Sequence, residues 1–465
     1  MDSWLIYGGG VAPLVFSDLM SGAGHEVTLI APGKQWGGIF NGIQIGDTRF
    51  DVGMTNFEFD LFTSQRKPID EYDPDLRGDL GKHIDDVKKY LGRHVNFHAL
   101  PALKMAFEGK FHDDLIISNH FEVLHALAPS VREAIQFELA DILAKPNPLH
   151  PSRKYASDSL LQHKTFEAVS VANHGKTLHS LFIKPMLRKV LGIGAEEIEA
   201  GFHRNGWVPL FYPETLASQF GSTPQCLKPT LFHYPDTSHF GAFITRIQES
   251  LSERPNVRLI TSASEVSIDR KFNTFHCDRG NFNYSRLVWG GDLSALSNAI
   301  GVQIETSKGA TRHASLNLYF VEVAEQGISN ESPVVLDPET DSPIFRVTNQ
   351  TLCAGTTADS HKVIIESHAN SSSSDENVTE FIRSRLPKYG INPDHLISLE
   401  HRSFANALKI PSQIEWDQFA ALRLQLLSEM PKLELIGPAA GYLAVTLNDQ
   451  IIQALRLGYM EGAFE

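Results

Sequence analysis

Apolar and polar residues along the first 31 positions follow the pattern of a strand, a helix and a second strand. The apolar run Trp4–Tyr7 predicts a short buried strand. Residues 14–24 have the pattern of a helix, and residues 25–30 (His-Glu-Val-Thr-Leu-Ile) are predicted to form a second strand. The three segments together have the length of one βαβ unit, in which two parallel strands are connected by a helix.

Glycines join the first predicted strand to the helix. Gly8 and Gly10 fit the first two positions of the pattern G-x-G-x-x-G, and Pro13 takes the place of the third glycine. Glycines at such a turn let the backbone approach a pyrophosphate, and the helix N-terminus after them offers free N–H groups and the positive end of a dipole. We therefore expect a dinucleotide to bind at Gly8, Gly10, Val11 and Ala12.

Two positions depart from the usual dinucleotide pattern. Pro13 suits the first turn of a helix, because the N–H that proline lacks has no partner there, but its ring is bulkier than glycine and could push the helix outward. The residue after the second strand is ordinarily acidic and holds a ribose, whereas this chain has Ala31. Two interpretations stay open: a working dinucleotide site, or a βαβ unit that has kept its fold and lost the ligand.

Beyond residue 31, predicted helices and strands are mixed, which places the chain in the α/β class. The helical pattern covers residues 131–144, most of 157–200, 240–254 and 451–459, and Asn448, Asp449 and Gln450 are expected to cap the last helix. Predicted strands cover residues 256–260, 265–268, 286–289, 315–322, 344–348, 363–366 and 433–436. Residues 315–322 alternate between apolar and polar, so we expect this strand to be half-buried.

Size, charge and cysteine usage narrow the class of protein. A chain of 465 residues predicts two domains, and a formal net charge of −14 argues against nucleic acid or an anionic membrane as the main partner. Cys226, Cys277 and Cys353 are too far apart for a zinc site, so we expect reduced thiols, no metal and a cytoplasmic protein. We also expect no signal peptide and no transmembrane segment, because no apolar run approaches the ~18 residues that a spanning helix needs.

Motifs spread over nearly the whole chain resemble those of the flavin amine oxidase and protoporphyrinogen oxidase superfamily, which includes the UDP-galactopyranose mutases. The opening βαβ unit resembles the FAD motif of that superfamily, and Trp36-Gly37-Gly38 falls where its members have a glycine pair. Further matches, in the expected order, are Phe50–Gly53, Phe182–Gly192, His233–Gly241, the strand pair that ends at Val266, and the closing segment Gly437–Ile451. The chain departs from the pattern at Ile39, at Met54–Phe57, at Ser238-His239 and at Leu191.

The resemblance implies a fold and a cofactor. It implies a discontinuous, Rossmann-like FAD-binding domain of the GR2 type, built from residues 1–80, 225–300 and 405–465. Residues 81–224 and 301–404 would form a second, α+β substrate domain, with the flavin ring between the two. The resemblance also implies further cofactor contacts at Gly37, Gly38, Val266, Gly437 and Asp449.

Three residues are candidates for catalysis, each with a structural alternative. Arg346 lies on a predicted strand of the substrate domain, where the mutases hold substrate phosphates with arginines, but it could equally be a structural arginine. His239 is a candidate for the flavin edge, although the chain has 20 histidines. Tyr442 follows the closing glycine loop and could line the active site or simply pack.

Three functions remain open. The first is an FAD-dependent oxidoreductase that acts on a small molecule. The second is a mutase-like flavoenzyme that acts on a nucleotide sugar, and the third is a cofactor-free, non-enzymatic relative. The chain shows no second nucleotide motif, which argues against reduction by a nicotinamide and favours an oxidase, a dehydrogenase with another acceptor, or a redox-neutral mutase.

Overall fold

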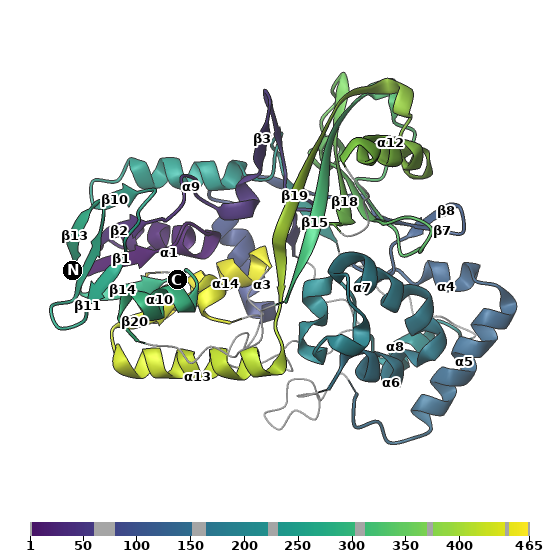
Figure 1. Ribbon diagram of the computed structural model, residues 1–465, viewed down its shortest axis with the longest axis horizontal. Coiled ribbons are helices and arrows are strands. Elements are labelled where there is room, and N and C mark those ends of the chain that lie inside the picture. Colours follow the sequence, from purple (N-terminus) through teal and green to yellow (C-terminus); the bar gives the residue numbers. More distant parts are fainter. Residues whose placement is uncertain are drawn as a thin grey trace.

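The protein has a mixed α/β architecture with several sheets. The computed structural model describes residues 2–59, 80–150, 164–221, 231–302, 312–369, 375–441 and 446–463. Figure 1 shows a layered part that holds both chain ends, a long twisted sheet beside it, and a cluster of helices next to that sheet.

A five-stranded parallel sheet, in the order β10-β2-β1-β14-β20, forms the centre of the layered part. Its strands come from separated stretches of the chain: β1 (Ser3–Tyr7), β2 (Glu26–Ile30), β10 (Val257–Ile260), β14 (Arg286–Trp289) and β20 (Leu433–Leu435). The predicted strands at residues 4–7, 25–30, 256–260, 286–289 and 433–436 are therefore confirmed. Because all five strands run in the same direction, their carboxyl ends meet at one edge of the sheet, where ligands bind in folds of this kind.

Both faces of the parallel sheet are covered, which explains why β1 is apolar at every position after Ser3. Trp4 and Ile6 pack on one side with α1 (Val11–Gly22), α9 (Ala242–Ser252), α14 (Leu447–Met460) and α3 (Leu80–Leu91). Leu5 and Tyr7 pack on the other side with α10 (Leu293–Ala299), α13 (Gln413–Glu429) and a small antiparallel sheet of β11 (Ser267–Asp269), β12 (Thr274–Cys277) and β13 (Gly280–Asn283). Figure 1 shows α9 and α13 on opposite sides of this sheet.

A second, seven-stranded sheet has the order β19-β15-β18-β17-β16-β7-β8 and is antiparallel except where β16 meets β7. The strands are β7 (Lys104–Phe107), β8 (Lys110–Asp113), β15 (Arg312–Ala324), β16 (Val334–Leu336), β17 (Ile344–Asn349), β18 (Ser360–His368) and β19 (Leu396–Ile410). The expectation of a half-buried strand at residues 315–322 is wrong. Leu318 and Phe320 are buried under the hairpin of β3 (Ile43–Ile45) and β4 (Thr48–Phe50), and Tyr319 and Val321 pack on the other face, beside α12 (Asp375–Arg385).

The helical cluster contains α4 (Glu122–Ala126), α5 (Pro129–Leu143), α6 (Phe166–Leu178), a π-helical turn (His179–Ile183), α7 (Lys184–Leu191) and α8 (Pro213–Ser218). The helix predicted at residues 131–144 is thus confirmed as α5. A third sheet, with β9 (Phe232–Pro235) between β5 (Phe57–Glu58) and β6 (Phe97–Ala99), and the short helix α11 (Gln350–Cys353) complete the fold. No helix within the described ranges is both long and apolar enough to cross a bilayer.

The start of the last helix differs from the sequence expectation. α14 begins at Leu447 rather than near residue 451, so Asn448, Asp449 and Gln450 lie inside its first turn. The cap is Thr446, whose side chain accepts a hydrogen bond from the N–H of Asp449. An Asn-Asp pair is a common cap signal, but the threonine before it meets the same need two residues earlier.

Candidate cofactor site

The glycine turn at the carboxyl end of β1 presents unpaired backbone donors. Gly10 is the N-cap of α1, and Val11 and Ala12 are its first two residues. The hydrogen bonds found in the described ranges use none of the N–H groups of Gly9, Gly10, Val11 and Ala12. Val11 and Ala12 are fully buried, and buried N–H groups are ordinarily paired, so the four donors fit an anionic group supplied by a ligand.

Pro13 does not push α1 away from the sheet, contrary to the concern that the sequence raised. Its ring packs against Gly290, the first residue after β14, where an added Cβ would lie 2.4 Å from the Pro13 Cγ. The ring also lies over Gly8, where a Cβ would come within 3.0 Å of the same atom. A third glycine in the turn normally allows the helix and the strand to approach closely. Here Gly290, just after the neighbouring strand β14, allows this approach instead.

The loop that carries Gly37 and Gly38 is attached to the glycine turn. The N–H of Gly37 donates to the Gly9 carbonyl over 2.6 Å. Gly37 has a φ of +82°, and a Cβ there would lie 2.3 Å from Ile244 of α9, so only glycine fits. Gly38 begins the next turn with open space beside it. The structure therefore places Gly37 beside the glycine turn, with Gly38 as the next residue along the chain.

The N-terminus of α14 meets the same turn. A Cβ added at Gly10 would lie 3.7 Å from the Oε1 of Gln450, in the first turn of α14. Gly437, just after β20, lies beside Ala12, and its N–H donates to the Gln453 Oε1 over 2.6 Å. Figure 1 shows α1 and α14 next to each other. Gly8, Gly10, Val11, Ala12, Gly37, Gly437 and the helix of Asp449 are thus gathered at the carboxyl edge of the parallel sheet.

The end of β2 lacks the acidic group that usually holds a ribose. Ala31 is fully buried, and its N–H and C=O are paired with Ile260 and Ala263. The chain continues from Ala263 to Val266, which is half-buried beside the core of that face. Val266 therefore lies near the end of β2, on the side where the resemblance implies the adenosine.

The turn that follows β4 contains a buried carboxylate. Asp51 accepts hydrogen bonds from the Tyr234 hydroxyl and, over 2.9 Å, from the N–H of Phe240, while its own N–H donates to the Gln350 Oε1 over 2.9 Å. Burial raises the pKa of Asp51 to about 6. These bonds fix the turn 51–56 against β9 and α11, in agreement with a structural role for Asp51 in the turn.

His239 lies in the loop between β9 and α9. Burial, together with the charges of Arg49 and Lys362, lowers the pKa of His239 to about 4, so its ring is neutral at pH 7. The Nδ1 atom is buried and has no hydrogen-bond partner among the described residues. A neutral imidazole with an unpaired buried nitrogen can form a hydrogen bond with a ligand, while burial and the two nearby cations disfavour its protonation.

Arg346 on β17 is already engaged. Its guanidinium forms a bidentate pair with Glu366 of β18, with 2.8 Å between Nη2 and Oε1, and lies 4.1 Å from the centre of the Trp207 ring. Arg346 and Glu366 are both almost completely buried. The charge of Arg346 is therefore neutralised within the sheet. Tyr442, the third catalytic candidate, lies outside the described residues.

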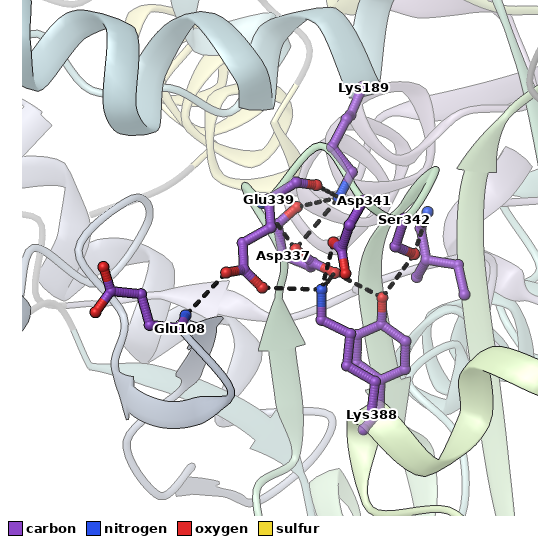
Figure 2. A network of polar contacts seen from close by, with 9 residues as sticks. Glu108, Lys189, Asp337, Glu339, Asp341, Ser342 and Lys388 are labelled. Carbon is purple, nitrogen blue, oxygen red and sulfur yellow. Dashed lines mark hydrogen bonds and ion pairs between the residues drawn. The ribbon is translucent and has the colours of Figure 1, made fainter.

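A polar network at the end of β16 contains three acidic residues whose spacing would suit a cation. The carboxylates of Asp337, Glu339 and Asp341 surround the ammonium group of Lys388, which lies 2.8–2.9 Å from one oxygen of each (Figure 2). Lys189 donates to the carbonyls of Asp337 and Glu339 over 2.6 and 2.7 Å. Lysine side chains thus already provide the positive charge at this cluster.

Sequence reasoning missed two asparagines on the segments around the start of α14. Asn448 and Asn56 each carry a buried polar atom without a hydrogen-bond partner in the described part of the chain. Both were visible in the sequence, Asn448 as a supposed cap and Asn56 as part of a departure from the superfamily pattern. Their importance depends on burial and on pairing, which the sequence does not reveal.

Comparison with known proteins gives a match in structure but not in sequence. No family model and no curated protein matches the chain. A crystal structure of reduced UDP-galactopyranose mutase superposes with a TM-score of 0.71 at 16% identity, over 99% of this chain and 94% of that one. A proposed protoporphyrinogen oxidase from Exiguobacterium sp. 255-15 gives a TM-score of 0.63 at 15% identity, over 99% and 98% of the two chains.

Putrescine oxidase gives a TM-score of 0.62 at 12% identity, with 99% of each chain covered. At such identities the likeness concerns the fold, and it extends over essentially the whole chain. The resemblance that the motifs suggested is confirmed at the level of the fold, which the chain shares with these three proteins.

Proposed function

We propose that this chain binds FAD and acts as a flavin-dependent oxidoreductase on a small molecule. The observation that carries the proposal is the set of four N–H groups at Gly9–Ala12, which have no partner in the described part of the chain and lie beside the N-terminus of a second long helix, α14. Two helix N-termini at one point favour a group with two negative charges, such as a pyrophosphate.

In this proposal, residues 1–80, 225–300 and 405–465 form a Rossmann-like FAD-binding domain of the GR2 type, and residues 81–224 and 301–404 form the substrate domain. Gly8, Gly10, Val11 and Ala12 hold the pyrophosphate and Val266 packs beside the adenosine. Other contacts come from Gly37, Gly38, Gly437 and Asp449. The cytoplasmic location expected from the widely spaced cysteines is part of the same proposal.

When bound, FAD supplies a ring system that accepts a hydride or attacks an electrophile. The residues of the chain then bind and orient the reactants. His239 forms a hydrogen bond with a reactant through Nδ1, which has no partner among the described residues. Arg346 and Tyr442 remain our candidates for contact with the substrate, and any role of Arg346 must be shared with Glu366, to which it is paired.

A mutase-like activity on a nucleotide sugar is the second candidate. The TM-score of 0.71 with UDP-galactopyranose mutase over nearly the full chain supports considering it. Such an enzyme works with reduced flavin and has no net redox change. Protection of the protein by UDP against thermal unfolding would favour this candidate. Bleaching of the flavin by a substrate, without a nicotinamide, would favour the oxidoreductase.

A titration of cofactor-free protein with FAD tests the proposed site. Gly10→Ala is the informative variant, since the φ of −77° at Gly10 suits any residue while an added methyl group blocks close approach of a phosphate. Gly22→Ala, at the other end of α1, is the matched control, because alanine suits a helix better than glycine. We expect Gly10→Ala to weaken FAD binding at least tenfold and Gly22→Ala to leave it unchanged. Equal affinity of both variants would contradict the proposed site.

A further inference from the structure

Two buried amide atoms on neighbouring segments have no hydrogen-bond partner among the residues that the structure describes. Asn448, in the first turn of α14, is 3% exposed, and its Nδ2 donates to the carbonyl of Glu58. The other side-chain atom, Oδ1, is buried and unpaired within the described ranges. Asn56, just before β5, is half-buried, and its Nδ2 is likewise buried and unpaired. Because buried polar atoms are ordinarily paired, these two point to a group that the described residues do not supply.

The two amides belong to segments that meet close to the glycine turn. Gln450, whose Oε1 lies near Gly10, is two residues after Asn448 on α14. Asn56 is two residues before Glu58, whose carbonyl Asn448 holds. The first turn of α14 thus contacts Gly10 through Gln450 and the segment 56–58 through Asn448, and these two side chains leave the helix on different faces.

The chemistry of these atoms selects the kind of group that fits. Oδ1 of Asn448 is an acceptor and Nδ2 of Asn56 is a donor, so the bound group must both donate and accept hydrogen bonds. Neither side chain is charged, which suits an uncharged hydroxyl chain rather than another phosphate. We propose that Asn448 and Asn56 bind the ribityl hydroxyl chain of FAD, between its pyrophosphate and its ring. This inference rests on the proposed FAD binding, and it gives Asn448 and Asn56 a role that the sequence did not assign to either residue.

The test compares two ligands and three variants. Asn56→Leu and Asn448→Leu remove the amides at similar volume. Asn256→Leu is the matched control, because Asn256 holds the carbonyls of Ser21 and His25 at the opposite edge of the parallel sheet. FAD contains the ribityl chain and ADP does not. The dissociation constants of both ligands are measured for each protein by calorimetry, together with the thermal midpoint of the cofactor-free protein.

We expect Asn56→Leu and Asn448→Leu to weaken FAD binding about tenfold each, the equivalent of one lost hydrogen bond, without changing the affinity for ADP. Asn256→Leu leaves both affinities unchanged. Asn56→Leu also raises the thermal midpoint of the cofactor-free protein, since it removes a buried donor that has no partner. A residue with a purely structural role would lower that midpoint.

Two results would overturn the inference, and they are distinguishable from failure of the proposed function. If the wild-type protein binds FAD and the two variants bind it equally well, FAD binding stands and the ribityl contacts are wrong. If FAD and ADP lose affinity to the same extent, the amides act on the phosphate end or on the fold. If the wild-type protein binds no FAD, the proposed function fails, and the inference with it. Asn56→Asp, which keeps the shape and loses the donor, replaces Asn56→Leu if the latter does not fold.

Discussion

Pro13 and Gly290 are packed so closely that any side chain added at Gly290 would clash with the Pro13 ring. A Cβ on Gly290 would lie 2.4 Å from the Pro13 Cγ. The two residues belong to α1 and to the end of β14, so their contact sets how near the glycine turn lies to the parallel sheet. A residue that departs from the usual motif is thus compensated by a glycine almost 280 positions later in the chain.

Gly290→Ala should lower the free energy of unfolding by about 1–3 kcal/mol, since the added methyl group overpacks the contact. Urea denaturation of the single variant and of Gly290→Ala/Pro13→Gly checks this. The double variant should recover most of the loss, because the shortened side chain makes room. Additive losses would mean that the two residues do not interact.

Glu366→Gln should destabilise the protein by about 3–5 kcal/mol, because it leaves the buried guanidinium of Arg346 without a counter-charge. Chemical denaturation measures the loss. Replacement of both partners, Arg346→Met with Glu366→Leu, should be much less costly than either single change. If Glu366→Gln is as stable as the wild-type protein, Arg346 does not depend on Glu366 and is free to serve a ligand.

Stability should fall below pH 6.5 partly because of His239. Its pKa is lowered to about 4 in the folded protein, so the unfolded chain takes up the proton first. The stability that the neutral ring contributes is fully present above pH 6.5, which is about the pKa of a histidine in the unfolded chain. This stability is lost as the pH falls toward 4. The ring is only half-buried, so we expect a loss of about 1–2 kcal/mol relative to His239→Gln. Parallel stability–pH curves for the two proteins would exclude this role.

Lys388→Met should cost about 3 kcal/mol of stability or more, because Asp337, Glu339 and Asp341 then face one another without the ammonium group. Lys145→Met is a suitable control. Lys145 pairs with Asp141 one turn away on an exposed surface, where such a pair contributes less than about 1 kcal/mol. Thermal denaturation of both variants measures the difference. Similar thermal midpoints for the two variants would show that the network in Figure 2 adds little to the stability of the folded protein.

Local patterns predicted the parts of this fold that depend on neighbours in sequence. The βαβ unit at residues 3–30 and the glycine turn follow from periodicity and from the chemistry of glycine. The two-sided burial of β15 could not be predicted, because the hairpin β3–β4 that covers one face comes from a stretch about 270 residues earlier.

The candidate site shows the same limit. The glycines could be identified from the sequence, because glycine between a predicted strand and a predicted helix indicates a tight turn or a close approach to a ligand. The pairing of Arg346 with Glu366 and the unpaired amides of Asn56 and Asn448 depend on contacts across the fold. An arginine that is paired and one that awaits a substrate look alike in a sequence, and so do a satisfied and an unsatisfied asparagine.

The most direct test of the account is an absorption spectrum of freshly purified protein, followed by denaturation and chromatography of what is released. The proposal predicts a flavin band near ~450 nm and the release of FAD, as expected for a protein that binds the cofactor through the turn at Gly8–Ala12. A colourless protein that stays colourless and gains no thermal stability with excess FAD would contradict it. The glycine turn would then be purely structural, and the cofactor-free alternative would take its place.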